Sequence, residues 1–154
     1  MMDKAGLEER ARSLIEDLLH TTPVFLVDFS VRGSRGSHAV DVFVESDDSL
    51  GVDRLAQLSR EIGFVMDTQD VMPGPYTLNV SSPGADRSLQ IPRQYRKHLG
   101  RDLRVHYRKD DQSMTEICGR LLDADDSAIQ IQRQTGKINI KFEDILWAKV
   151  QLPW

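Results

Sequence analysis

Apolar residues recur at helical spacing in two stretches of the first half of the chain. The two sets, each spaced by three and four positions, are Leu7, Ala11, Leu14, Ile15, Leu18 and Leu19, and then Leu55, Leu58, Ile62, Val65 and Met66. Thr22-Pro23 ends the first stretch, because proline cannot continue a helix. Gly51-Val52-Asp53 opens the second. The pattern therefore predicts two amphipathic helices, each burying one face.

Strand-like sequence surrounds the second helical stretch. Residues 24–31, 40–45 and 76–81 are rich in β-formers, and the last of them alternates strictly between apolar and polar positions. The glycine-containing residues 32–38 join the first two as a hairpin, either as a simple loop or as a finger that contacts RNA. The order αββαβ predicts a two-layer α+β sandwich, with both helices on one side of a three-stranded sheet.

The second half of the chain consists of shorter segments. Pro92 begins a short helical stretch that runs to His98, and Gly100 marks a break after it. Short strands are expected at about residues 102–108, 116–122, 128–133, 137–142 and 148–152, separated by Gly, Asp or Ser. Periodicity alone predicts a small all-β domain here. We therefore expect an α+β domain over residues 1–90 and a β domain over residues 91–154.

Composition limits the class of protein. The 154 residues are 40% hydrophobic and 29% charged, which is typical of a folded globular chain. The N-terminus is charged, and no apolar run has the length of a membrane span, so we expect a cytoplasmic protein. Cys118, the single cysteine, is expected to be a small core or strand residue. Because phosphate-loop and dinucleotide motifs are missing, we predict neither a cofactor nor nucleotide-driven catalysis.

Charge divides unevenly between the two halves. Residues 1–90 carry 8 basic against 15 acidic residues, a net charge of −7, whereas residues 91–154 carry 12 against 9, a net charge of +3. The two values account for the net charge of −4 of the whole chain. Opposite charges on the two halves indicate different partners or different roles.

A basic segment at the start of the second half is a candidate nucleic-acid interface. It contains Arg93, Arg96, Lys97, Arg101, Arg104, Arg108 and Lys109, with Asp102 as the only acidic residue among them. Planar side chains are interleaved, namely Tyr95, His98, His106 and Tyr107. Clustered cations neutralise phosphates, and planar groups stack on unpaired bases. A solvated basic face that balances the acidic first half remains an equal alternative.

The strand at residues 76–81 ends in Ser-Ser-Pro-Gly. Pro83 suits the second position of a type II turn and Gly84 the third. Such a turn would hold together four polar residues: Ser81, Ser82, Asp86 and Arg87. Most of them are expected to satisfy backbone groups of the turn, and we favour a fixed turn that also presents Arg87 to RNA or protein. A serine nucleophile is disfavoured, because the Gly-x-Ser-x-Gly motif and a neighbouring histidine are missing.

Two acidic clusters are candidates for cation binding. They are Glu45 with Asp47 and Asp48, and Asp123 with Asp125 and Asp126. Neither contains the glycine and terminal glutamate of a calcium loop, so we assign both to turns and predict no metal site.

The segment Ser81-Ser82-Pro83-Gly84 followed by Asp86-Arg87 resembles the hallmark of the bacterial ribosome maturation factor RimP family. The order of strands and helix before it, and the C-terminal ending from Ala148 to Pro153, are similar to that family as well. One departure is Ser88, which stands where the family pattern leads us to expect proline.

The resemblance implies a fold and a function. The fold is a KH-like first domain followed by an SH3-like, Sm-like β-barrel. The function is that of a monomeric, non-enzymatic factor that binds the immature small (30S) ribosomal subunit and assists its assembly and rRNA maturation. The barrel would associate with a ribosomal protein beside the decoding site, and no membrane is involved. The alternative is a free-standing Sm-like or KH-like regulator that binds mRNA or small RNA, although such a binder is expected to be basic overall.

Overall fold

The chain folds into two compact units. A computed structural model describes residues 4–84 and 87–151, and it divides the chain into Met1–Pro83 and Gly84–Trp154. The division falls after residue 83, not after residue 90 as predicted. The reason is that Leu89 is 8% exposed, packs in the second core, and donates its N–H to the carbonyl of Ala148 at 2.7 Å. Residues 87–90 therefore belong to the second unit.

The first unit has the predicted αββαβ order. Its elements are α1 (Lys4–Leu19), β1 (Val24–Arg32), β2 (His38–Ser46), α2 (Val52–Thr68) and β3 (Tyr76–Ser81). β1 and β2 form the predicted antiparallel hairpin, whereas β2 and β3 run parallel, which the intervening helix allows. Side chains along β3 alternate between half-buried and exposed, as its sequence predicts.

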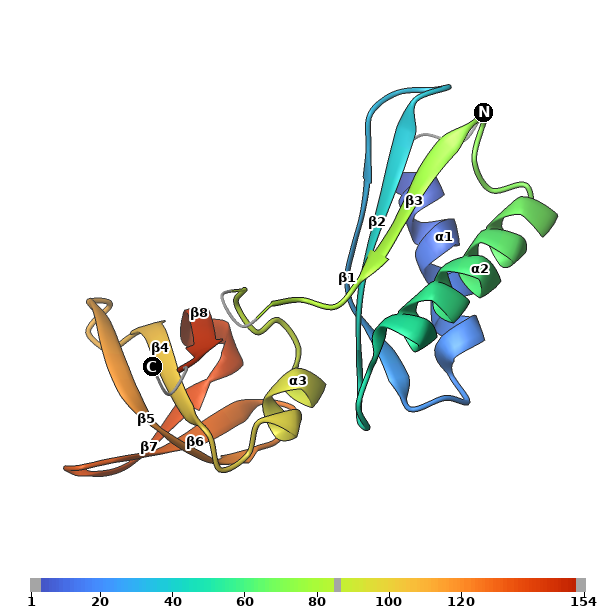
Figure 1. Cartoon of the computed structure of the whole chain (residues 1–154). Coiled ribbons are helices and arrows are strands. Elements are labelled where there is room, and N and C mark those ends of the chain that lie inside the picture. The colour runs from blue at the N-terminus through green and yellow to red at the C-terminus, as the bar shows by residue number, and fades with distance from the viewer. Residues whose placement is uncertain (1–3, 85–86, 152–154) are drawn as a thin grey trace. The chain divides into compact units, whose positions relative to one another are not determined.

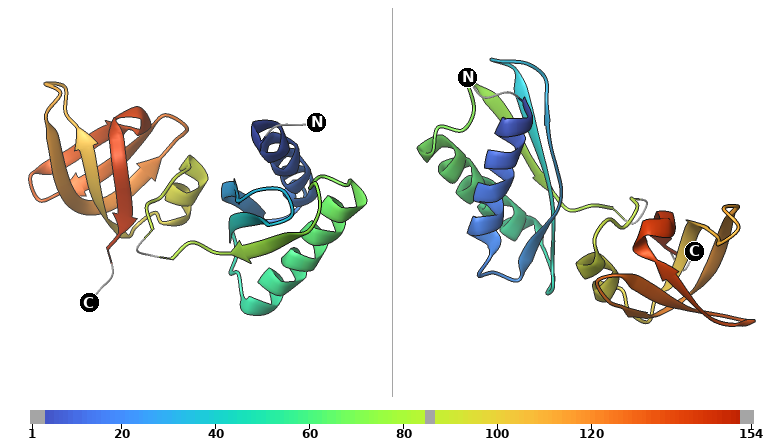
Figure 2. Two further views of the ribbon diagram at one scale, coloured as in Figure 1. Left: turned by 90° about the horizontal axis from the view of Figure 1, so that it is seen from above. Right: turned by 180° about the vertical axis from the view of Figure 1, so that it is seen from behind.

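Both helices of this unit cover the same face of the sheet (Figures 1 and 2). The predicted apolar stripes provide the core, with Ile15, Leu58, Ile62 and Met66 each at most 1% exposed. They pack against strand residues that face the helices, including Val31, Val40, Val42 and Val44. The opposite face of the sheet carries a polar network, in which Asp41 accepts hydrogen bonds from the Arg32 guanidinium at 2.5 Å and the Asn79 amide at 3.0 Å.

The second unit contains one short helix and a five-stranded sheet. Its elements are α3 (Pro92–Lys97), β4 (Asp102–Arg108), β5 (Met114–Ala124), β6 (Ala128–Arg133), β7 (Gly136–Lys141), the 3-10 turn η1 (Phe142–Asp144) and β8 (Ile145–Val150). β4 and β6 have the predicted bounds. β5 is longer than predicted at both ends, and β8 begins at Ile145 rather than at residue 148, because its first residues still pair with β4.

The strand order in this sheet is β7-β6-β5-β4-β8, with every pair antiparallel. Bulges interrupt the β4–β8 and β5–β6 pairs, and the sheet curls visibly in Figure 1. Leu103, Val105, Leu121 and Ile131 line its inner face and are fully buried. In the part of the chain that the structure describes, no helix combines the length and apolar character needed to cross a membrane.

Candidate nucleic-acid interface

The predicted basic residues all lie in the second unit, from α3 through β4 to the turn after it. Arg93 is half-buried, and six others are exposed, namely Arg96, Lys97, Arg101, Arg104, Arg108 and Lys109. β4 alternates inward and outward side chains, so Leu103, Val105 and Tyr107 enter the core while Arg104 and Arg108 point to solvent. The strand thus separates its apolar and basic residues onto opposite faces.

Three of these arginines form ion pairs with carboxylates from other elements. Arg96 contacts Asp126 at 3.2 Å, and Arg108 contacts Asp144 at 3.6 Å. Arg104 donates twice to Glu116 of β5, at 2.6 and 3.0 Å. Within the basic segment itself, Asp102 is the only acidic residue. The sequence therefore overstated the net positive charge of the folded surface, because these three carboxylates come from other parts of the chain. Such exposed pairs contribute about 0–1 kcal/mol each, so a phosphate can exchange with the carboxylate.

Among the described residues, Lys97, Arg101 and Lys109 form no ion pair. The charge of Lys109 nevertheless acts on the nearby Asp111, whose pKa is held below the usual value by hydrogen bonds from Ser113 and then by that charge. His98 lies near two of them: its burial, and then the charges of Arg101 and Lys97, hold its pKa below the usual value. This shift favours the neutral form of His98, so the positive charge around it comes mainly from Lys97 and Arg101.

The two tyrosines of the basic segment do not serve as stacking groups. Tyr95 is 2% exposed and meets Phe142 edge-on at 5.0 Å, and burial raises its pKa. Tyr107 is 7% exposed and faces the core from β4. The prediction that these rings stack on bases is wrong, because both supply apolar volume to a small core.

A different aromatic residue occupies the outer face of the sheet. Trp147 of β8 pairs across from His106 of β4, and the two rings stack with centroids 5.6 Å apart and an interplanar angle of 8°. The Arg104 guanidinium lies over the indole at 5.6 Å and the Lys149 ammonium at 5.4 Å. Trp147 and Lys149 were absent from the sequence prediction. Their two-residue spacing places them on one face of a strand, but only the pairing of β8 with β4 brings them to the basic segment.

The predicted cluster at the Ser-Ser-Pro-Gly segment is divided between the two units. Ser81 ends β3 and Ser82 follows it, both exposed, in the first unit. Arg87 belongs to the second unit, and Asp86 lies outside the described residues. The backbone hydrogen bond here runs from the Arg87 N–H to the Gly84 carbonyl at 3.0 Å, two residues further along than the predicted turn. The joint site of these four residues therefore stays a prediction.

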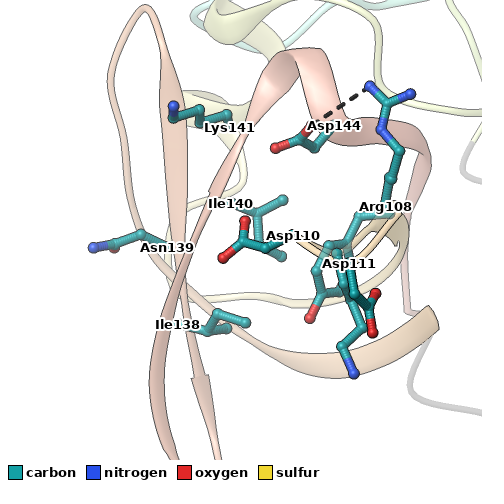
Figure 3. A pocket seen from close by; sticks show the side chains of 10 residues that line it. Arg108, Asp110, Asp111, Ile138, Asn139, Ile140, Lys141 and Asp144 are labelled. Carbon is teal, nitrogen blue, oxygen red and sulfur yellow. Dashed lines mark ion pairs between the residues drawn. The ribbon is translucent and has the colours of Figure 1, made fainter. Parts of the chain in front are cut away.

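An open hollow of about 480 Å³ lies at the end of β4. Figure 3 shows its rim, where Arg108 reaches Asp144, and its wall on β7, which includes Ile138 and Ile140. Lys109 and Lys141 also line it, but so do three carboxylates, those of Asp110, Asp111 and Asp144. The mixed charge makes this hollow a poor phosphate site, despite the basic residues predicted there.

The acidic cluster at residues 123–126 and the cysteine serve local roles, whereas Glu45 of the other cluster lies within β2 and is 9% exposed, so its assignment to a turn is wrong. The Asp125 carboxylate accepts the N–H groups of Ser127 at 2.7 Å and Ala128 at 2.8 Å, and these bonds hold its pKa below the usual value. This is the predicted turn role. Across the described ranges, no group of three or more potential metal ligands comes together. Cys118 is a strand residue as predicted, but it is exposed rather than part of the core.

Comparison with known proteins places this arrangement in a family. The family model described as RimP N-terminal domain matches residues 14–86. The protein "Ribosome maturation factor RimP" of Chlorobium phaeobacteroides (strain DSM 266 / SMG 266 / 2430) is 34% identical over 125 residues, which cover 75% of this chain and 72% of that protein. The chain belongs to the RimP family. The larger unit contains only 83 of the 154 residues, so a match that covers 75% of the chain must include residues of both units.

Ser88 departs from the pattern expected of the RimP family and makes a hydrogen bond that proline could not make. The expected residue after the Asp-Arg pair is proline, but here the Ser88 hydroxyl accepts a hydrogen bond from the buried N–H of Ala148 at 3.1 Å. The Leu89 N–H donates to the carbonyl of Ala148. The segment before α3 therefore binds the outer edge of β8 through both the N–H and the carbonyl of Ala148. Proline has no hydroxyl and could not accept the first bond. Ser88 thus anchors this segment of the RimP-family chain to its sheet.

Proposed function

We propose that this chain is a ribosome maturation factor that binds the immature small (30S) ribosomal subunit and assists its assembly and rRNA maturation. The observation that carries the proposal is the match to a protein named "Ribosome maturation factor RimP" across parts of both units. For the fold, we propose a KH-like first unit and an SH3-like, Sm-like barrel. The one-sided helices of the first unit and the curled, bulged sheet of the second support this assignment.

The proposed action is binding without covalent chemistry or a cofactor. A monomeric factor in the cytoplasm that prefers one conformer of the immature particle shifts the population toward it and is then released. The exposed cations of the second unit, above all Lys97 and Arg101, are suited to rRNA phosphates. The paired residues Arg96, Arg104 and Arg108, together with Arg93, Lys109 and the Ser81, Ser82, Asp86 and Arg87 segment, complete the candidate contact set. A ribosomal protein beside the decoding site is the proposed protein contact.

Sedimentation with purified immature small subunits at two salt concentrations tests the proposal. Substituting Lys97→Glu together with Arg101→Glu should weaken co-sedimentation, because two uncompensated cations become repulsive. If both contact phosphates of unpaired rRNA, the slope of log affinity against log salt should also fall by roughly 1.4. The matched control is Lys137→Glu with Lys141→Glu, which makes the same charge change on β7.

The two variants separate a local contact from a general charge effect. Equal weakening in both variants would show that net charge, not the surface at Lys97 and Arg101, drives association. Failure of the parent protein itself to co-sediment with immature small subunits would contradict the proposed function. Tight binding to free RNA in that case would favour the RNA-binding regulator.

A further inference from the structure

Trp147 is held in a fixed position on the outer face of the second unit. His106 stacks on the ring from the neighbouring strand, and Arg104 and Lys149 place their cations over it at 5.6 and 5.4 Å. The indole is thus contacted from two strands, by His106 and Arg104 of β4 and by Lys149 of β8. The indole is therefore preorganised, so a ligand that stacks on it does not have to order it.

A hollow adjoins this tryptophan. It measures about 290 Å³, close to the lower limit for small-molecule sites, and Trp147 forms part of its lining. Leu146, 58% exposed, and the half-buried Phe142 and Ile145 add apolar wall. Gln90, an exposed residue with a side-chain amide, is also part of the lining. A planar group of the size of one base suits this combination of aromatic face, apolar wall and amide.

The charges around the indole indicate which planar group this is. Arg104 and Lys149 place their cations over the ring; Arg104 also pairs with Glu116 at 2.6 Å, whereas Lys149 makes no ion pair with any described residue. The unit as a whole carries 13 basic and 10 acidic residues over positions 84–154, a net charge of +3. A basic protein segment would be repelled here. A nucleotide suits both the aromatic ring and the cations, since its base is planar and its phosphate is negative.

We propose that Trp147 and the adjoining hollow bind one unpaired base of single-stranded RNA, with Lys149 and Arg104 holding the neighbouring phosphates. The proposal rests on the proposed function in that rRNA is the expected source of the strand. It goes beyond that function by naming a base-binding subsite centred on Trp147, a residue outside the predicted basic segment. Stacking tolerates any base, so the subsite selects for unpaired RNA rather than for a sequence.

Binding of short RNAs to the full chain tests the subsite. The probes are fluorescently labelled single-stranded hexamers of adenylate and of uridylate, measured by anisotropy. Trp147→Ala should weaken binding by roughly 5- to 150-fold, the effect typical of losing one base–aromatic stack. Trp147→Phe should retain most of the affinity, because it keeps an aromatic face. Phe64→Ala is the matched control, since Phe64 is a 71% exposed aromatic residue on α2 of the other unit.

A second measurement does not depend on the alanine variant folding. In a Trp154→Phe background, Trp147 is the only tryptophan of the chain, and stacking of a base on it should quench its fluorescence on titration with the hexamers. A duplex of the same length should quench it much less, because its bases are already stacked. Unchanged emission at saturating hexamer, or equal quenching by the duplex, would overturn the proposal. So would a folded Trp147→Ala variant that binds hexamers like the parent.

The outcomes also separate this proposal from the proposed function. If parent and Trp147→Ala co-sediment equally with immature subunits but only the parent binds hexamers, the subsite stands and docking uses other contacts. If the parent fails to co-sediment while hexamer binding depends on Trp147, the subsite stands and the maturation role falls. Binding of hexamers that is independent of Trp147, beside normal co-sedimentation, removes the subsite alone.

Discussion

Ser88 provides the sharpest test of how the second unit is held together. Its hydroxyl accepts the N–H of Ala148 at 3.1 Å, and Ala148 is fully buried. Ser88→Ala would leave that N–H without this acceptor. A buried donor left unpaired costs about 1–3 kcal/mol. Because Ser88 itself is half-buried, we expect a loss in the lower part of this range, about 1–2 kcal/mol.

Proline, the residue expected from the family pattern, should behave differently from alanine. Ser88→Pro loses the same hydroxyl, but a stiffer unfolded chain offsets about 0.4–1 kcal/mol of the loss where the backbone accepts proline. Ser88→Pro should therefore be less destabilised than Ser88→Ala. Ser88→Thr keeps a hydroxyl at the same position and is the matched control. Its stability should stay close to that of the parent.

Urea unfolding followed by tryptophan fluorescence measures these effects in the right place. Both tryptophans of the chain belong to the second unit, so the signal reports that unit. With a slope of about 1–3 kcal/mol per molar urea, a loss of about 1–2 kcal/mol lowers the midpoint by roughly 0.3–2 M. An unchanged midpoint in Ser88→Ala, or an equal drop in Ser88→Thr, would refute the role of the hydroxyl.

Two further predictions concern the backbone and the acid response. Gly63→Ala should stabilise the protein by up to about 1 kcal/mol, because alanine favours the helix and its Cβ would lie at an ordinary 3.7 Å from Leu78. Gly119→Ala should destabilise the protein by about 1–3 kcal/mol, because its Cβ would lie 2.5 Å from the Gln132 carbonyl oxygen. Opposite shifts of the two urea midpoints check this pair of predictions. The hydrogen bond from Arg32 lowers the pKa of Asp41, so this interaction stabilises the fold above about pH 4 and is lost as the pH falls further. Asp41→Asn should flatten the fall in stability between about pH 5 and pH 3, and an identical pH profile would contradict it.

Local pattern was sufficient for most secondary structure. The apolar stripes of α1 and α2, the alternation in β3 and the bounds of β4 and β6 follow from side-chain periodicity, which depends only on neighbours in the chain. The domain boundary did not follow from it. Residues 87–90 contain no regular element, and they belong to the second unit only because Ser88 and Leu89 bond to β8, some 60 residues later.

The candidate site shows the same limit more clearly. The sequence by itself determined that the second half is basic and that β4 carries cations on one face. Only the tertiary structure decided which of these cations remain free, because Glu116, Asp126 and Asp144 reach the arginines from distant elements. Pairing of β8 with β4 likewise brought Trp147 beside His106, while burial removed the two tyrosines from the surface. Charge and aromatic content are properties of a segment, whereas pairing and exposure depend on strand neighbours that lie far away in the sequence.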